Sequence, residues 1–417
     1  MPWRTRCGAS SRRRNDRGPR LPATDVMALR PIAAGNRPAR VDKVKRGDFS
    51  AAMPAWILAL VLAFAVAAVP ARAEASQQLN IYNWSDYIAP DTVARFERET
   101  GIKVNYDVYD SNETLEAKLL AGHSGYDLVV PSASPFLARQ IAAGVYRPID
   151  KAKLANYGNL DPRILAAAAK ADPGNRYGVP YLWGTTGIGY NKAMVAAALG
   201  PNAPTDSDRL LFDPANAKKL ASCGISLLDT AQELFPAALA YLGRDPLSRA
   251  PAELERAVGV IAGIRPYVRK FNSSEYINDL ANGDLCIAYG YSGDVIQARN
   301  RAREAKNGIA IAYAIPKEGA MMWIDMMAIP KDAPHPDAAL RFIDYVLRPQ
   351  TIAAISNAVA YANPNLPATA LVDPALRDDP GIYPPPAVRA RLFFDTPVTA
   401  QYERLRTRAW TRVKTGE

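Results

Sequence analysis

The segment at residues 79–110 decides the fold and reads LNIYNWSDYIAPDTVARFERETGIKVNYDVYD. Residues 79–83 have the composition of a strand, and residues 91–100 place their apolar side chains on one helical face before Gly101. Residues 102–108 alternate apolar and polar side chains, which is typical of a strand buried on one side. The segment therefore predicts a strand, a helix and a second strand.

The next segment continues this alternation of strands and helices. Ser111 or Asn112 is placed to cap a helix over residues 115–120. The short apolar run at residues 127–131 fits a strand of a parallel sheet. This order predicts an α/β fold in which helices cover an open parallel sheet. Later elements of the same kinds are expected as strands at 225–228, 285–289 and 320–329, a helix at 253–264, and a basic surface helix at 399–414.

The first 73 residues have the features of a basic leader and a signal peptide. Ala55 to Val69 form an apolar run of 15 residues, which is shorter than the roughly 20 residues of a membrane span. Small side chains at positions 71 and 73 predict removal of the leader after Ala73. The alternative is an uncleaved N-terminal anchor. Met53 is a candidate for the true start of translation.

The leader also explains the charge of the chain. The whole sequence has 51 Lys and Arg and 41 Asp and Glu, a net charge of +10. From Glu74 onward the numbers are equal, at 37 each. The basic excess therefore gives no reason to expect a nucleic-acid partner, and we expect an exported, periplasmic protein.

Two of the three cysteines remain after the leader is removed. Cys7 belongs to the leader, whereas Cys223 and Cys286 form an even pair in an oxidising compartment. A disulfide between them is one reading, and two buried thiols are the other. Neither cysteine has the CxxC spacing of a zinc or redox site.

Three loops that follow predicted strands share an unusual composition. Residues 83–87, 131–134 and 289–294 contain aromatic side chains, hydroxyls and carboxylates but no Lys or Arg. In open α/β sheets, ligands bind at the carboxyl ends of the strands. Aromatic faces attract organic cations, and carboxylates accept charge-assisted hydrogen bonds from ammonium groups. These loops therefore favour a site for a diamine.

The chain offers carboxylates and aromatic rings for both parts of such a site. The candidate carboxylates are Asp86, Glu233, Asp294 and Asp325. The candidate aromatic walls are Trp84, Tyr87, Tyr291, Trp323 and Tyr361. Each ring could instead lie in the core, and Asp294 could simply cap a helix over residues 295–303.

Signatures of catalysis are weak in this sequence. His123 and His335 have no metal-ligand spacing and are expected to be solvated. The glycine-rich run at 184–189 lacks a phosphate-binding lysine, and we interpret it as a chain crossing where glycine permits close approach. No nucleophile, base and orienting group are seen to converge. We therefore expect a binding protein that is not an enzyme and that needs no cofactor or metal.

Five motifs in order resemble the periplasmic polyamine-binding proteins of ABC importers, and are most similar to the putrescine-binding branch. They are IYNWSDYI at 81–88, YDLVVPS at 126–132, TTGIGYN at 185–191, YINDLANGD at 276–284 and IPKEGA at 315–320. The resemblance covers residues 79–414, which is nearly the whole mature chain.

The resemblance implies a two-lobed periplasmic binding protein fold of type II, in which a ligand cleft lies between two mostly parallel sheets. It implies a first lobe at 77–182 plus 324–390 and a second lobe at 183–323 plus 391–417. It also implies that Cys223 pairs with Cys286. The ligand positions that it implies are Trp84, Ser85, Asp86, Tyr87, Ser132, Glu233, Tyr291, Asp294, Trp323, Asp325 and Tyr361.

Three positions depart from the pattern of the family. Tyr291 stands where many relatives have Trp, and Pro135 is an extra residue after Ser134. Trp323 stands where the putrescine branch tends to have Phe and spermidine binders tend to have Trp. The overall motifs thus lean to putrescine, and Trp323 leans to spermidine.

These observations predict a periplasmic solute-binding protein that captures putrescine or spermidine and delivers it to the permease subunits of an ABC transporter. The resemblance implies a soluble monomer. The alternatives are a binding protein for another small cation or a metal, a periplasmic enzyme acting on amines, and a polyamine sensor.

Overall fold

The computed structural model describes residues 78–416. The predicted leader, signal peptide, cleavage site and start at Met53 lie outside the described residues, as does Cys7. Within residues 78–416 no helix is both long enough and apolar enough to cross a membrane.

The strands form one mixed sheet in the order β2-β1-β3-β9-β4-β7-β5-β6, with β8 paired to β4 and β10 paired to β9. The three strands at each end of this order run parallel, and β9 and β4 join them through antiparallel pairing. The strands are β1 (Gln78–Trp84), β2 (Lys103–Tyr109), β3 (Leu128–Val129), β4 (Gly178–Asn191), β5 (Ile225–Leu227), β6 (Lys270–Phe271), β7 (Ile287–Tyr291), β8 (Ile311–Ala314), β9 (Ala320–Ala328) and β10 (Leu392–Phe393).

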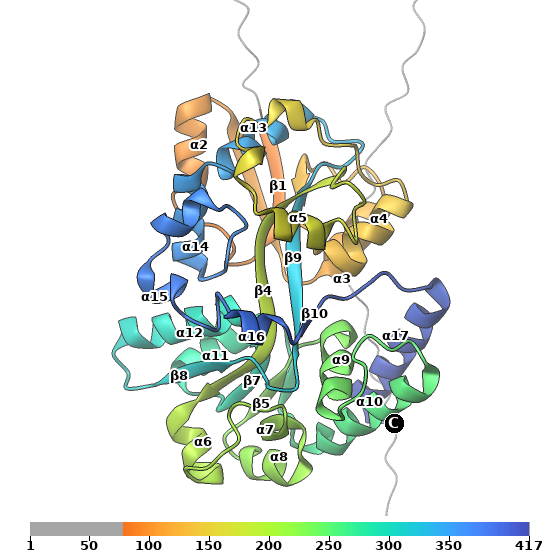
Figure 1. The fold of residues 1–417 in the computed structure, drawn as a ribbon, viewed down its shortest axis with the longest axis vertical. Helices are drawn as coiled ribbons and strands as arrows, with labels where there is room; N and C mark the ends of the chain where they lie inside the picture. Colours follow the sequence, from red (N-terminus) through yellow and green to blue (C-terminus); the bar gives the residue numbers. More distant parts are fainter. Residues whose placement is uncertain (1–77, 417) are drawn as a thin grey trace, which may run out of the picture. The chain divides into compact units, whose positions relative to one another are not determined.

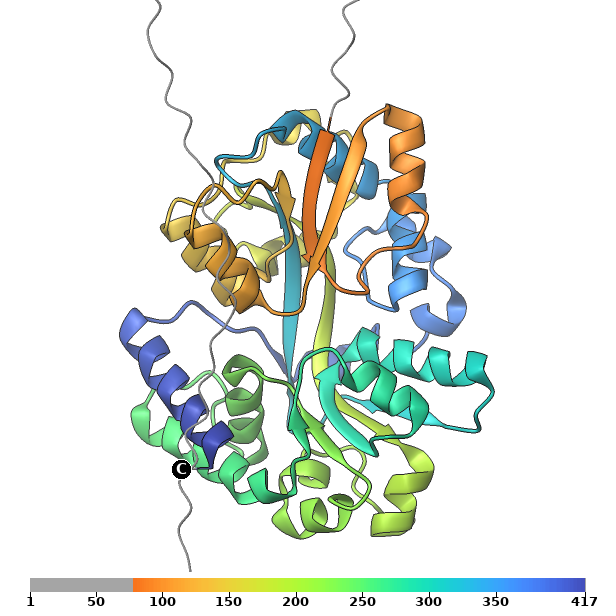
Figure 2. The same cartoon turned by 180° about the vertical axis from the view of Figure 1, so that it is seen from behind.

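Helices cover the faces of this sheet, as Figures 1 and 2 show. The longer helices are α2 (Thr92–Thr100), α3 (Asn112–Leu120), α6 (Lys192–Leu199), α9 (Ala231–Tyr241), α10 (Pro251–Ile264), α12 (Ser292–Ala305), α13 (Pro336–Val346), α14 (Pro349–Val359) and α17 (Ala400–Thr415). The shorter helices are α4 (Ala138–Ala142), α5 (Pro162–Ala168), α7 (Arg209–Phe212), α8 (Pro214–Leu220), α11 (Tyr276–Asn282), α15 (Pro374–Arg377) and α16 (Pro386–Arg389).

The opening strands and helices occur where the sequence predicts them. The strand, helix and strand of residues 79–108 are β1, α2 and β2. Most of their apolar side chains are buried or half-buried, but Val108, which the alternation predicted to face inward, is 52% exposed. Ser111 rather than Asn112 caps α3, because the Ser111 side chain accepts a hydrogen bond from the Thr114 amide. The apolar run at 127–131 contains β3, which is buried.

Two hydrophobic cores lie along the sheet. One draws its buried side chains mainly from residues 79–183 and 323–382, and the other draws them from residues 188–311 and 402–413. β4 and β9 pair with each other and extend from one core toward the other (Figure 1). The two cores therefore share a continuous pair of long strands.

The glycine-rich run at 184–189 lies in the middle of β4, where it passes between the cores. A Cβ atom on Gly184 would lie 2.7 Å from the Trp323 ring and 2.9 Å from Ser292 Oγ. Only glycine leaves room for this contact, because real Cβ atoms do not approach other atoms so closely. The expected close approach at this run is confirmed.

The second half of the chain contains both the predicted tail helix and the predicted disulfide. The predicted tail helix is α17, which packs beside α9 and α10 (Figure 2). It is more than a surface helix, because its inner face buries Tyr402, Trp410 and Val413 in the second core. The disulfide between Cys223 and Cys286 is confirmed, with an S–S distance of 2.12 Å.

Candidate functional site

The eleven residues predicted to bind ligand all line one cavity near the carboxyl ends of β1, β3 and β7. They come from six separate segments of the chain, and the fold brings all of them together. The empty volume between the lining residues is about 1020 Å³, including the part that is open to solvent. The cavity is lined by Trp84, Ser85, Asp86, Tyr87, Ser132, Glu233, Tyr291, Asp294, Trp323, Asp325 and Tyr361, together with residues that the sequence did not indicate.

Asp325 is the most buried of the predicted carboxylates. Ser132 Oγ donates to its Oδ1 at 2.6 Å, and Tyr87 Oη donates to its Oδ2 at 2.8 Å. Burial raises the pKa of Asp325 to about 7, although the two hydroxyl donors act in the opposite direction. Asn112 Nδ2 in turn donates to Ser132 Oγ at 3.0 Å, so the hydroxyl proton is left for Asp325.

Asp294 lies in the first turn of α12, not before the helix. The alternative that it caps a helix starting at Val295 is wrong, because α12 begins at Ser292. Tyr276 Oη donates to Oδ2 of Asp294 at 2.7 Å, and Tyr361 Oη donates to Oδ1 at 2.5 Å. Burial raises the pKa of Asp294 to about 6, and these two donors oppose the rise.

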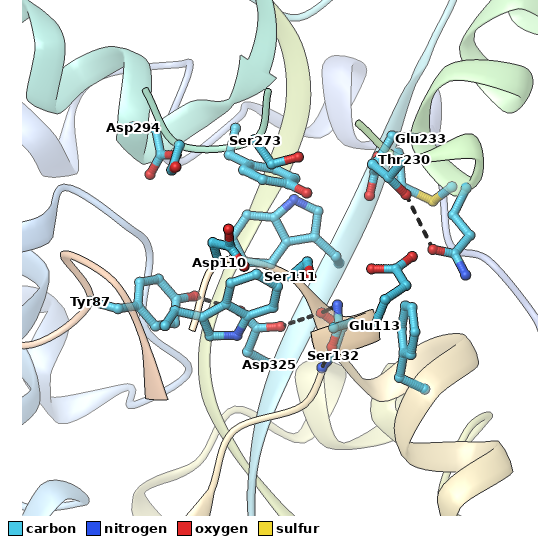
Figure 3. A pocket seen from close by; sticks show the side chains of 18 of the residues that line it. Tyr87, Asp110, Ser111, Glu113, Ser132, Thr230, Glu233, Ser273, Asp294 and Asp325 are labelled. Atoms are coloured by element: carbon cyan, nitrogen blue, oxygen red, sulfur yellow. Dashed lines mark hydrogen bonds between the residues drawn. The ribbon is translucent and has the colours of Figure 1, made fainter. Parts of the chain in front are cut away.

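Glu233 lies on α9 at the opposite side of the cavity from Asp294 (Figure 3). Its Oε2 atom is buried and has no hydrogen-bond partner among the described residues. Burial raises the pKa of Glu233 to about 7, and the nearby Thr186 only partly offsets this effect. A buried oxygen without a donor is costly, so this atom is suited to a cation that arrives from outside.

Aromatic rings connect these carboxylates. Trp323 packs edge-on against Tyr291 and Tyr361, with ring centroids 5.7 and 5.3 Å apart. Tyr361 packs in the same way against Tyr87 at 5.2 Å. The series offers ring faces and edges between Asp294 and the other side of the cavity, which suits a chain of methylene groups between charged ends.

The lining of the cavity is strongly acidic. Within the described part of the chain, residues 78–416, it includes eight carboxylates and no Lys or Arg. Some of the carboxylates already have cation partners from outside the cavity: Arg301 lies 3.2 Å from Asp86, and Lys414 lies 2.9 Å from Asp229. Within residues 78–416 no ion pair is formed by Asp294, Asp325 or Glu233.

Several residues near this site were not identified from the sequence. Tyr276 lies in the YINDLANGD motif, and Asn112 was considered only as a helix cap, so a signal existed for both. Glu113, Asp229 and Asp395 carried no such signal. The extra Pro135 also lines the cavity. Among the other lining residues missed are Tyr109, Asp110, Phe136, Thr230, Gln232, Ser273, Met322 and Phe394.

The two histidines lie away from the cavity lining. His123 is exposed, as expected. His335 was also expected to be solvated, but its Nδ1 atom lies 3.1 Å from Oδ2 of the buried Asp127. The described residues contain no group of three or more His, Cys, Asp or Glu that is arranged to hold a metal ion.

A comparison with protein families identifies the relatives of this chain. The family described as bacterial extracellular solute-binding protein matches residues 91–384. The chain belongs to this family. It is 55% identical over 365 residues to the putrescine-binding periplasmic protein PotF of Escherichia coli. The match covers 87% of this chain and 98% of that protein.

Two further relatives are also named for binding putrescine. The putrescine-binding periplasmic protein SpuD of Pseudomonas aeruginosa is 53% identical, again over 87% of this chain and 98% of that protein. A P. aeruginosa putrescine/agmatine-binding protein is 44% identical, over 82% of this chain and 93% of its own length. The prediction that the chain belongs to the periplasmic polyamine-binding proteins is confirmed.

A solved structure confirms the fold class. A protein from Listeria monocytogenes, described as a spermidine/putrescine ABC transporter, superposes with a TM-score of 0.73 and is 32% identical. The match covers 82% of this chain and all of that one. The three sequence relatives above are named for binding, and none of them is named as an enzyme. The solved structure is described as an ABC transporter.

Proposed function

We propose that this chain captures a polyamine, putrescine or spermidine, in the acidic cavity. The observation that carries the proposal is a series of aromatic rings between three carboxylates, Asp294, Asp325 and Glu233, none of which forms an ion pair within residues 78–416. The names of the relatives support the same ligand class, since they are described as binding putrescine, agmatine, cadaverine or spermidine.

Each predicted site residue has a role in this proposal. Asp294 and Asp325 hold one ammonium group, and Glu233 holds the other. Asp86 helps on the Asp294 side, because its charge acts on Asp294 and it pairs with Arg301 of the same helix, α12. The rings of Trp84, Tyr87, Tyr291, Trp323 and Tyr361 cover the methylene groups. Asp86 contributes less than the other carboxylates, because it is paired with Arg301 and its side chain is 52% exposed. Ser85 and Ser132 complete the set, and Ser132 acts through its bond to Asp325.

Capture involves two lobes in this proposal. We assign residues 77–182 and 324–390 to the first lobe, and residues 183–323 and 391–417 to the second. A hydrogen bond that joins the two cores supports a closed arrangement of the lobes. Tyr361 belongs to the first core, and its hydroxyl donates to Asp294 on α12. A ligand that contacts both lobes biases the pair toward its closed form.

We further propose that the protein is exported to the periplasm by its signal peptide. There it acts as a monomer that delivers its ligand to the permease subunits of an ABC transporter, with no catalytic step and no cofactor. The periplasmic location in the names of the sequence relatives and the ABC transporter in the description of the L. monocytogenes structure support this part of the proposal.

Calorimetric titration of the chain from Glu74 to Glu417 tests the ligand class. Putrescine and spermidine are the ligands, and the neutral diol of putrescine's length is the matched control. We expect heat from at least one amine and none from the diol, because the diol has no charge for the carboxylates. The ratio of the two amine affinities gives the preference. No heat from either amine would overturn the proposal.

A further inference from the structure

Tyr276 is a buried residue that contacts the site without lining the cavity. It is the first residue of α11, and its side chain is fully buried in the second core. Its hydroxyl makes two hydrogen bonds at the junction between β7 and α12. It accepts from the backbone amide of Tyr291 at 2.9 Å and donates to Asp294 Oδ2 at 2.7 Å.

The chemistry of the partners fixes the direction of these two bonds. A backbone N–H group can only donate, so the Tyr276 hydroxyl must accept from Tyr291. The single hydroxyl proton is then left for Asp294. Tyr361 repeats this arrangement, because its hydroxyl accepts from the Asp294 amide at 3.2 Å and donates to Asp294 Oδ1 at 2.5 Å.

Each oxygen of Asp294 therefore accepts a hydrogen bond from a tyrosine hydroxyl. Hydrogen bonds donated to a carboxylate favour its charged form, whereas burial favours the neutral form. The other charged groups that act on Asp294 oppose each other: Asp86 raises its pKa, and Arg301 lowers it. The two hydroxyls are the largest influences that keep this buried group ionised.

The Tyr276 ring packs closely against the backbone of Gly290. A Cβ atom on Gly290 would lie 2.5 Å from the Tyr276 ring, so the ring occupies space that only a glycine leaves open. The ring alone could fill this space as Phe. Phe would leave the Tyr291 amide and Asp294 Oδ2 each without this partner, which carries a cost in a buried site.

We propose that Tyr276 is a positioning residue for cation binding: it fixes the orientation of Asp294 and keeps it an acceptor-only carboxylate that an ammonium group can pair with. This inference rests on the proposed function for its effect on ligand. Its effect on Asp294 itself does not depend on any ligand. Tyr276 also fixes the backbone of Tyr291, so the last residue of β7 and the first turn of α12 are held together.

The experiment compares Tyr276→Phe with the wild-type chain, and Tyr146→Phe is the matched control. Tyr146 is also buried, at 4% exposure, and its hydroxyl donates to Gln140 at 2.6 Å, away from the cavity lining. The first readout is the pKa of Asp294 in the ligand-free protein, measured by carboxyl-carbon NMR. We expect Y276F to raise it by about one unit, which is the effect of one lost donor, and Y146F to leave it unchanged.

The second readout is the affinity for putrescine between pH 5.5 and 8.5. We expect Y276F to weaken binding about eightfold at pH 5.5, about twofold near pH 7 and hardly at all at pH 8.5, because Asp294 is ionised in both proteins at the highest pH. A merely structural role would weaken binding equally at every pH. An equal loss across the pH range, or an unchanged Asp294 pKa, would overturn the inference.

A second variant tests the same proposal if Y276F folds poorly. Incorporation of 3-fluorotyrosine at position 276 keeps both hydrogen bonds and makes the hydroxyl a stronger donor. We expect the Asp294 pKa to fall in this protein, and a rise or no change would count against the proposal. If the wild-type chain binds no polyamine, the proposed function fails, while the NMR titration still decides the role of Tyr276.

Discussion

The two sides of the cavity treat their carboxylates differently. On one side, Asp294 and Asp325 each receive two hydroxyl donors. On the other side, Glu233 has an oxygen with no partner among the described residues. Burial raises the pKa of all three, to about 6, 7 and 7 in that order.

This difference teaches how a cation site can be prepared before its ligand arrives. A carboxylate with two donors keeps a fixed orientation and still has lone pairs for an ammonium group. A carboxylate without donors is less stable in the empty protein, so it has more to gain from a cation. Carboxylates of the first kind therefore fix where an ammonium group binds. A carboxylate of the second kind makes the folded protein more stable when the ligand is bound than when the site is empty.

Removal of a pre-oriented carboxylate should give the largest effect. We expect Asp294→Ala to weaken diamine binding by about two to three orders of magnitude, because a desolvated ammonium would lose its partner. Calorimetric titration measures the loss, and circular dichroism checks the fold.

Asp229 provides the matched control for that substitution. It lines the same cavity but is already paired with Lys414 at 2.9 Å. Asp229→Asn should change the affinity less than about tenfold, since exposed ion pairs contribute little. Unchanged affinity in a folded D294A protein would show that our assignment of the first side is wrong.

Lowering the pH should weaken ammonium binding on both sides of the cavity. Asp325, Glu233 and Asp294, with pKa values of about 7, 7 and 6, must be ionised to pair with ammonium groups. We expect constant affinity above about pH 8 and a loss of more than tenfold between pH 8 and 6.

Titrations in buffers of different ionisation enthalpy measure the coupled protons. Near pH 7 the protein should release protons as the ligand binds, because the ammonium groups lower the pKa of each carboxylate. A flat pH profile with no proton release would contradict the description of all three groups.

Neutralising Glu233 should separate stability from binding. The folded pKa of about 7 lies above the ordinary value of 4.5, so the folded state holds an extra proton between these values. Stability from this group is therefore present at low pH and is lost as the pH rises from about 4.5 to 7. Glu233→Gln should stabilise the empty protein at pH 8 by about 1–3 kcal/mol.

Thermal unfolding at pH 5 and at pH 8 checks this expectation. The stabilisation by E233Q should nearly vanish at pH 5, where wild-type Glu233 is already protonated. The same substitution should weaken putrescine binding about tenfold. If the E233Q protein were less stable than wild type at pH 8, the Glu233 carboxylate would already have favourable partners in the empty protein.

A smaller aromatic ring between the two carboxylate sides of the cavity should have the smallest effect on affinity. Trp323 contacts both Tyr291 and Tyr361, so Trp323→Phe shortens the surface that covers methylene groups. We expect spermidine affinity to fall about threefold to tenfold and putrescine affinity to fall less. Competition between the two amines measures the ratio. An unchanged ratio would remove Trp323 as a determinant of preference.

Local sequence patterns predicted much of the fold because they report local geometry. The period-two alternation at 102–108 gives β2, and the apolar face before Gly101 gives α2. Tail residues 399–414 were correctly predicted to be helical, but their burial was missed, since charge composition does not reveal which face of a helix packs. The placement of Asp294 inside α12 was missed for a similar reason: helix starts are set by backbone contacts as well as by cap residues.

The sequence by itself determined the kinds of side chain at the strand ends and, through its motifs, the family and the disulfide pair. Only the tertiary structure decided which carboxylates are free for a cation and which, such as Asp86 and Asp229, already have one. It alone connected Tyr276 to Asp294. The physical reason is that charge pairing and burial depend on residues distant in the chain, whereas sequence periodicity reports only neighbours.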